Sequence, residues 1–296
     1  MIHSPVLFEE VLHYLTPADG GIYVDGTLGI GGHSRGILDR CGPTGRVIGF
    51  DQDEDALVLA KKELFSYEKR FTCIRSNFAN IKEVLAELEV PRIDGLLLDL
   101  GLSSLQLDTG GRGFSFKASA PLDMRMDKRT PVTAADLINK EEENELADIF
   151  FHYGEEQQSR RIAARIVAER KKGPIETTDR LANIVAQAVP KRFHPKKIHV
   201  ATKVFQALRI AVNHELENLA KILDDAPFIL KPGGKMCVIS FHSLEDRLVK
   251  RRFRENPAYV VLTKKPVTPS KKELLANPRS RSAKLRAAAI SDSSSR

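Results

Sequence analysis

The first hundred residues alternate short apolar runs with helical stretches, and this alternation limits the chain to few folds. The apolar runs predict four strands, at residues 21–25, 46–51, 71–74 and 94–99. The other stretches predict helices at residues 33–40, 54–69 and 81–89. Strands that alternate with helices form a parallel sheet with helices on both faces. The predicted fold class is therefore α/β, with a mostly parallel, Rossmann-like sheet.

Three of these strands end in an aspartate, namely Asp25, Asp51 and Asp99. Ligands of open parallel sheets bind outside the carboxyl ends of the strands. We therefore expect a ligand site where these three carboxylates lie.

The pattern changes after the fourth strand, because residues 107–199 contain no convincing strand. A loop rich in glycine and aromatic residues comes first, at 110–116. Helices are predicted to follow it at 134–151, 155–172 and 179–189, with Thr133 and Thr178 as N-caps. This segment predicts an inserted all-helical domain, at residues 108–204, with a role in substrate recognition.

The sheet pattern then resumes. One or two helices are predicted within residues 200–230, followed by strands at 235–240, 259–262 and 284–290. The sheet domain is thus expected in two parts, residues 1–107 and 205–296.

A glycine-rich loop, residues 25–34, joins the first strand to the first helix, and its glycines 29, 31 and 32 let a ligand approach the backbone closely. Asp51 follows Gly29 by twenty-two residues, the spacing at which a carboxylate accepts hydrogen bonds from a ribose. The run reads G-x-G-G-H, which argues against NAD, and no Walker-type lysine follows it, which argues against ATP. Asp25 suits a ligand with a cationic amino-acid group, so S-adenosylmethionine is the predicted cofactor. His33 is expected either to donate to this cofactor or to cap the helix.

Asp99 lies at the end of the fourth predicted strand, where cofactor and substrate would meet. The lone pair of a cytosine amino group is delocalised into the ring, and an acceptor for its N–H hydrogens can turn that lone pair toward a methyl donor. Asp99 is the predicted catalytic acceptor, with Ser103 or Ser104 as secondary acceptors. The alternative is that Asp99 only contacts the cofactor and the serines shape a turn. Stacking candidates for adenine or a flipped base are the phenylalanines 78, 114 and 116.

No metal site is predicted, because His194 and His199 have no acid nearby and look like surface residues. His242 is expected either to line the pocket or to cap a helix. The three cysteines are far apart and odd in number, which favours a reducing cytoplasm. Apolar runs are far shorter than the roughly 20 residues of a membrane span, and the first ten residues do not read as a secretory signal.

Positive charge is concentrated late in the chain. Residues 242–296 carry fourteen Lys or Arg and five Asp or Glu, whereas the whole chain has a net charge of +7. A basic block on a near-neutral body favours a polyanionic partner, since each neutralised phosphate releases counterions. A solvated tail is the alternative.

Long motifs along nearly the whole chain resemble the bacterial 16S ribosomal RNA (cytosine-N4)-methyltransferases. The motifs lie at residues 3–7, 25–34, 50–53, 99–104, 112–116, 121–127, 205–210, 213–216, 240–247 and 277–282. The resemblance implies a class I methyltransferase sheet with an inserted helical domain, and a target cytosine in the decoding region of the small subunit. It also implies cofactor contacts at Gly31, Gly32, His33, Asp51, Phe78, Asp99 and Gln106.

One departure concerns DNA amino-methyltransferases, which carry an Asp-Pro-Pro-Tyr-like motif where this chain has Asp99-Leu-Gly-Leu102. The catalytic role of Asp99 therefore rests on analogy. The partner implied is small-subunit ribosomal RNA or the small ribosomal subunit. Alternatives left open are an amino-methyltransferase acting on DNA, another RNA or a small molecule, and a non-catalytic assembly factor. The sequence also leaves open whether the protein is a monomer or a homodimer.

Overall fold

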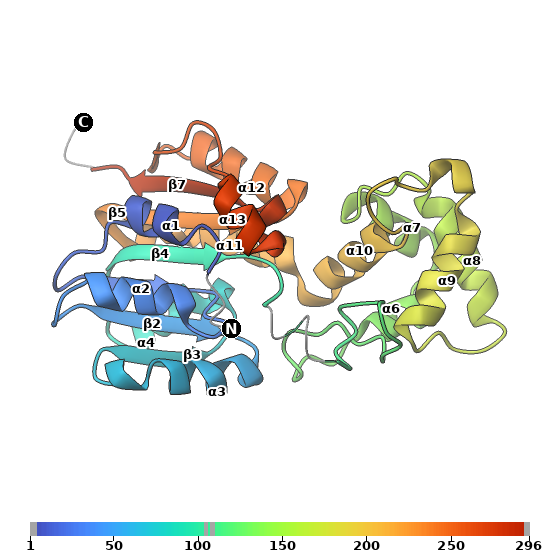
Figure 1. The fold of residues 1–296 in the computed structure, drawn as a ribbon, viewed down its shortest axis with the longest axis horizontal. Coiled ribbons are helices and arrows are strands. Elements are labelled where there is room, and N and C mark those ends of the chain that lie inside the picture. The colour runs from blue at the N-terminus through green and yellow to red at the C-terminus, as the bar shows by residue number, and fades with distance from the viewer. Residues whose placement is uncertain (1–4, 104–105, 107–109, 293–296) are drawn as a thin grey trace. The chain divides into compact units, whose positions relative to one another are not determined.

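The computed structural model describes residues 5–103, 106 and 110–292. The chain divides into two compact units. One comprises Met1–Gly101 and Leu216–Arg296, and the other comprises Leu102–Glu215 (Figure 1). The units are called the sheet unit and the helical unit below.

Seven described strands form the sheet, in the order β3-β2-β1-β4-β5-β7-β6. The strands up to β5 pair in parallel, whereas β7 is antiparallel to both β5 and β6. Their bounds are β1 Ile22–Asp25, β2 Arg46–Asp51, β3 Phe71–Arg75, β4 Ile93–Asp99, β5 Leu230–Ser240, β6 Tyr259–Val261 and β7 Lys284–Ile290. The prediction of a mostly parallel α/β sheet is confirmed.

Helices cover both faces of this sheet. Their bounds are α1 Phe8–Leu15, α2 Gly32–Arg40, α3 Glu54–Glu63, α4 Ile81–Glu87, α11 Glu215–Ile229, α12 Ser243–Glu255 and α13 Lys271–Ala276, with short 3-10 turns η1 Phe65–Tyr67, η2 Phe78–Asn80 and η4 Pro278–Ser282. The predicted helix 54–69 therefore ends early, and η1 follows it. Helix α1 was not predicted.

Successive side chains of a strand point to opposite faces of the sheet, so neighbouring residues pack into two separate cores. Leu96 and Leu98 of β4 join a cluster that includes Ile222 of α11. Leu97, between them, joins a cluster that includes Val11 of α1. All three leucines of β4 are fully buried, and burying such a side chain stabilises the fold by about 1.5–3 kcal/mol. An apolar strand such as β4 therefore needs a helical layer on each side.

The helical unit contains α6 Ala134–Lys140, α7 Glu143–His152, α8 Ser159–Arg170, α9 Thr178–Ala188, η3 Lys191–Phe193 and α10 Thr202–Asn213. Thr133 caps α6 as predicted. The single helix predicted at 134–151 is two helices, because Glu142 and Glu145 form a capping box that starts α7. The N-cap of α9 is Thr177, not Thr178.

The second boundary between the units falls after Glu215, later than the predicted position at residue 204. The cause is α10, whose apolar face packs into the core of the helical unit through Val204, Phe205 and Leu208. Periodicity predicts such an apolar face, but does not say which core it joins. Within the residues that the structure describes, no helix is both long and apolar enough to cross a membrane.

Candidate cofactor and catalytic site

Asp25 organises the glycine loop at the end of β1. Its Oδ1 accepts a hydrogen bond from the Thr27 backbone N–H at 3.2 Å, and its Oδ2 accepts one from the Ser34 hydroxyl at 2.7 Å. The side chain is buried, and burial raises its pKa to about 6 despite these two donors. Asp25 thus ties the start of the loop to the first turn of α2.

The loop itself needs glycine at two positions. Gly29 has φ 53° and Gly31 has φ 87°, both in the left-handed region that disfavours side chains. A Cβ at Gly31 would lie 2.8 Å from Cδ1 of Leu64, whereas one at Gly29 would meet nothing within 4 Å. Gly31 is therefore held on one side by the core, and Gly29 faces open space.

Gly31 is also the N-cap residue of α2, which has no side-chain cap and no acid in its first turn. Gly32 follows, and a Cβ there would lie 2.6 Å from Cγ of Pro5. The N–H groups at the start of a helix attract negative or polar ligand groups. The loop thus brings backbone donors to the carboxyl edge of the sheet.

Asp51 ends β2 and holds the same loop from the neighbouring strand. Its Oδ2 accepts a hydrogen bond from the Gly29 N–H at 2.9 Å, and its Oδ1 accepts one from the Asp53 N–H at 2.9 Å. Burial raises the pKa of Asp51 to about 6, although both bonds act in the opposite direction. Each carboxylate oxygen has a second lone pair, so Asp51 can also accept from a ribose hydroxyl.

Phe78 begins η2, just after β3. Asn77 caps this turn by accepting the Ala79 N–H at 2.9 Å. Phe78 is half-buried, and a Cβ at Gly26 would lie 3.1 Å from its Cβ. Phe78 therefore lies next to Gly26 of the glycine loop.

Asp99 ends β4, next to β1. Its backbone N–H donates to Oγ1 of Thr27 at 2.6 Å, which ties the two strand ends together. A quarter of its side chain is exposed, yet its Oδ1 atom is buried and has no hydrogen-bond partner within the described chain. Burial raises the pKa of Asp99 well above its usual range, and the charges of Asp25 and Glu245 raise it further.

His33 lies in the first turn of α2 and faces Asp99. Its Nε2 is 3.7 Å from Oδ2 of Asp99, and its ring stacks on Phe8 with centroids 6.0 Å apart. Neither ring nitrogen makes a hydrogen bond of ordinary geometry with the part of the chain that the structure describes. Burial lowers the pKa of His33 to about 4, so the ring is neutral at pH 7. His33 does not cap α2, contrary to one of its two predicted roles.

The sheet unit therefore gathers three carboxylates, Asp25, Asp51 and Asp99, whose pKa values are all raised. Among the described residues, no lysine or arginine forms an ion pair with any of them. Buried carboxylates without a nearby cation are costly to ionise. A positively charged ligand would offset this cost, and the arrangement is therefore complementary to a cation.

Two predicted site residues, Ser103 and Gln106, belong to the helical unit. They bond to each other, since Gln106 accepts the Ser103 N–H at 3.1 Å and Ser103 Oγ accepts the Gln106 N–H at 3.2 Å. The side chain of Gln106 is buried. Ser104, the other predicted acceptor, lies outside the described residues.

Other candidates have structural roles. Phe114 and Phe116 pack against the core of the helical unit, where Phe116 contacts Phe205 at a ring distance of 4.7 Å. His242 is the N-cap of α12 and forms a capping box with Glu245, so the helix-capping alternative is confirmed.

Three polar residues that shape the site, Thr27, Ser34 and Glu245, were not predicted from the sequence. Thr27 and Ser34 lie within the glycine motif, and their small hydroxyls were a usable signal. Glu245 lies far from Asp99 in sequence and comes near it only because β4 pairs with β5.

A parallel sheet with β7 inserted antiparallel between β5 and β6, a glycine loop after β1 and an acid ending β2 defines the class I methyltransferase fold. A family model described as the MraW methylase family matches residues 1–291. The chain belongs to this family.

Several relatives carry the name Ribosomal RNA small subunit methyltransferase H. The protein from Desulfotalea psychrophila is 60% identical over 287 residues, which cover 97% of both chains. That from Geobacter sulfurreducens is 50% identical and covers 97% of this chain and 98% of its own. That from Trichormus variabilis is 53% identical, with 97% and 91% covered. The similarity therefore extends over both units.

Proposed function

We propose that this protein transfers the methyl group of S-adenosylmethionine to the exocyclic N4 amino group of a cytosine in the decoding region of 16S ribosomal RNA. The observation that carries the proposal is Asp99. It is a carboxylate at the end of β4, beside the glycine loop, with a buried oxygen that has no hydrogen-bond partner among the described residues. Family membership and the relatives' names support ribosomal RNA methylation.

The residues of the sheet unit fit this cofactor. The three carboxylates suit its cationic sulfonium and ammonium groups, and the open side of Gly29 and the helix start at Gly31 suit close approach of the ligand to the backbone. Asp51 would accept from the ribose, and Phe78 would contact the adenine. Gly32, His33 and Asp99 would complete the cofactor contacts in this unit, and Gln106 would add one from the helical unit. When bound, S-adenosylmethionine supplies an electrophilic methyl group.

Asp99 has the chemistry needed to act on the substrate amine. Its free oxygen would accept an N–H of the cytosine amino group and so direct the nitrogen lone pair away from the ring. The nitrogen becomes more acidic as its new bond to carbon forms, and a carboxylate with a raised pKa can take up the released proton. Holding donor and acceptor in line adds an entropic advantage. Ser103 would act as a secondary acceptor.

His33 is neutral, so it places no positive charge next to the cationic cofactor. One ring nitrogen could donate to Asp99 once the site contracts by less than about 1 Å, since the atoms are now 3.7 Å apart. In this role His33 would fix the orientation of the Asp99 carboxylate.

The substrate would be small-subunit ribosomal RNA or the small ribosomal subunit, and the basic segment 242–296 would contribute to its binding. We place this activity in the cytoplasm, where ribosomal RNA is found. A homodimer stays a prediction, which sedimentation equilibrium would check.

The test is methyl transfer from labelled S-adenosylmethionine to small ribosomal subunits that lack their native methylations, followed by nucleoside analysis. Label in N4-methylcytidine is the expected result. Label in another nucleoside would overturn the target but keep the reaction type. Cofactor binding without transfer to either RNA or subunits would favour the non-catalytic alternative, and transfer to DNA in place of RNA would favour the DNA alternative.

A further inference from the structure

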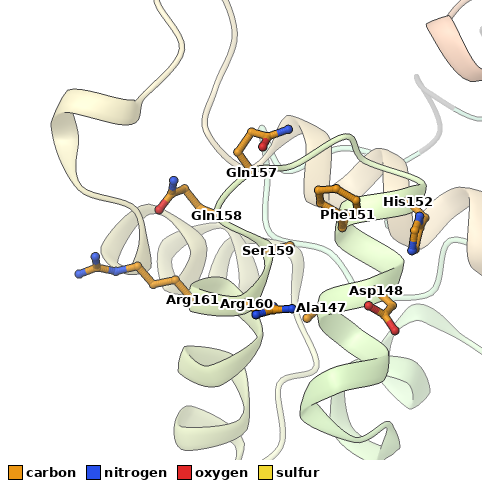
Figure 2. Close-up of a pocket in the computed structure, with 9 residues that line it drawn as sticks. All are labelled: Ala147, Asp148, Phe151, His152, Gln157, Gln158, Ser159, Arg160 and Arg161. Carbon is orange, nitrogen blue, oxygen red and sulfur yellow. The ribbon is translucent and has the colours of Figure 1, made fainter.

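The helical unit contains a pocket of about 500 Å³ between the end of α7 and the start of α8. Ligand sites typically have volumes of about 300–1,000 Å³. Figure 2 shows that α7 contributes Phe151, His152 and Asp148, that the connecting segment contributes two glutamines, and that the first turn of α8 contributes two arginines. The pocket is formed entirely by residues of this one unit.

The two arginines, Arg160 and Arg161, lie where positive charge is unfavourable for the helix. The N-terminus of α8 carries the positive end of the helix dipole, its first turn has no acid, and its N-cap Gln158 makes no side-chain cap. Within the described chain, neither guanidinium forms an ion pair with a carboxylate, and both side chains are exposed. Figure 2 shows that the two side chains leave the helix in different directions, so each guanidinium group offers its own site for an anion such as phosphate.

The rest of the lining suits a nucleobase. Phe151 is 47% exposed, and His152 meets it edge-to-face with ring centroids 5.2 Å apart. The side chains of Gln157 and Gln158 offer both donors and acceptors, which match the edges of a base. The carboxylate of Asp148 adds an acceptor for an amino group of a base. A stacking surface, amides and two arginines together match a nucleotide better than an acidic peptide, which offers no planar ring to stack.

We propose that this pocket binds one unpaired nucleotide of the RNA substrate, with Arg160 and Arg161 each at a different backbone phosphate beside that nucleotide and Phe151 against the base. The inference rests on the proposed function for the choice of RNA. It adds a recognition site on the helical unit. This site shares no residue with the group of carboxylates in the sheet unit.

The test measures binding of the full-length protein to a transcript of the 16S decoding region at several salt concentrations. The double variant Arg160→Gln/Arg161→Gln should bind at least about tenfold more weakly near 0.1 M salt. The slope of log affinity against log salt should fall in magnitude by about 1.4, since each neutralised single-strand phosphate contributes about 0.7. Phe151→Ala should weaken binding by about five- to a hundredfold with the slope unchanged.

Matched controls come from the same unit. Arg165 lies on α8 outside the pocket and pairs with Glu169, so Arg165→Gln tests the loss of one positive charge elsewhere on the same helix. Phe193 is 49% exposed and lies outside the pocket, so Phe193→Ala matches Phe151→Ala. Both controls should bind RNA as the unaltered protein does, and thermal unfolding should show that all variants are folded.

Unchanged RNA affinity of folded pocket variants, or an equal loss in Arg165→Gln, would overturn the proposal. Normal binding to the transcript but weakened binding to assembled subunits would also overturn it and assign the pocket to a ribosomal protein. The proposed reaction is tested separately by methyl transfer with the unaltered protein. If pocket variants lose RNA affinity but the unaltered protein transfers no methyl group, the pocket stands and the proposed reaction fails.

Discussion

The Nε2 atom of His33 lies 3.7 Å from Oδ2 of Asp99, and burial disfavours the charged form of both side chains. The distance is too long for a hydrogen bond and short enough for electrostatic coupling. In the absence of a cationic ligand, both groups are held closer to neutrality than they would be in water. A cationic ligand changes this balance in favour of a charged Asp99. Ligand binding and ionisation of the Asp99 carboxyl group are thus linked.

Replacing Asp99 should lower the rate of methyl transfer without lowering the stability of the protein. We expect Asp99→Ala to abolish methyl transfer, with a loss of at least about 10²-fold in kcat, because the acceptor for the amino group is gone. The free energy of unfolding at pH 7 should not fall, because the variant no longer buries an ionisable group whose folded pKa is raised. Single-turnover kinetics and urea denaturation measure the two effects. Asp94→Asn, at the opposite end of β4, is the control and should keep its activity. Near-normal turnover of Asp99→Ala would contradict the assignment.

His33 should make stability depend on pH between about 4 and 6.5. The unfolded chain binds a proton at His33 below about pH 6.5, whereas the folded protein does not until about pH 4. Relative to His33→Asn, the unaltered protein should therefore lose about 1.4 kcal/mol of stability for each pH unit of acidification in this window. Asp25 and Asp51 titrate with the opposite sign, but they are common to both proteins and cancel. Urea denaturation at pH 4.5, 5.5 and 7 provides the comparison, with exposed His13→Asn as control. A difference that does not vary with pH would rule out a buried neutral histidine.

The hydroxyl of Ser34 should matter more at pH 7.5 than at pH 5. It donates to Asp25, whose folded pKa is about 6, so the bond involves a carboxylate only above that pH. Ser34→Ala should cost about 1.5–3 kcal/mol at pH 7.5 and less at pH 5, because a bond to a charged acceptor is stronger. Ser240 is also buried, but its hydroxyl donates to the neutral Lys284 carbonyl, so Ser240→Ala should show no such pH dependence. Equal costs at the two pH values for Ser34→Ala would mean that Asp25 does not change its protonation state between pH 5 and pH 7.5.

Alanine at Gly31 should damage the loop more than alanine at Gly29. Both positions have positive φ, which costs a non-glycine residue about 1–2 kcal/mol, but only a Cβ at Gly31 meets the core, at Leu64. We expect Gly31→Ala to lower both thermal stability and cofactor affinity by more than Gly29→Ala does. Calorimetry and titration with S-adenosylmethionine measure the two quantities. The reverse order of stabilities would show that the loop is rebuilt around the new side chain.

Arg279 and Arg281 should contribute to RNA binding through charge. Both are exposed and lie in η4. Replacing them with glutamine should weaken RNA binding. The slope of log affinity against log salt concentration should fall in magnitude by about 0.7–0.9 for each phosphate that is no longer neutralised. Arg46 begins β2, at the edge of the sheet opposite the carboxyl ends, and is exposed, so Arg46→Gln is the control. The affinity for RNA, measured from about 50 to about 200 mM salt, tests this prediction. An unchanged slope would leave the helical unit as the principal RNA surface.

Much of the sheet unit was predictable because its signals are local. Each strand from β1 to β4 is a short apolar run, and parallel pairing then places Asp25, Asp51 and Asp99 at one edge of the sheet. The glycine loop was recognisable because it combines a strand, glycines, a helix and a downstream acid.

What the sequence did not reveal depends on non-local contacts or weak local signals. Helix α1 starts after Leu7, which has φ 51° and provides no side-chain cap, so no start signal exists. The influence of Glu245 on Asp99 requires β4 and β5 to be neighbours. The placement of α10 depends on which core accepts Phe205. The pocket at Phe151 and Arg160 was equally hidden, since it forms only when α7 and α8 pack together.

The position of β7 has a consequence for how the protein is made. This strand, Lys284–Ile290, separates β5 from β6, and both pair with it rather than with each other. During synthesis the ribosome must therefore release the chain as far as β7 before the sheet can close. Until then β5 has an open edge that invites pairing with other nascent chains. A protein that modifies ribosomal RNA thus completes its own sheet only after the ribosome has released Lys284–Ile290.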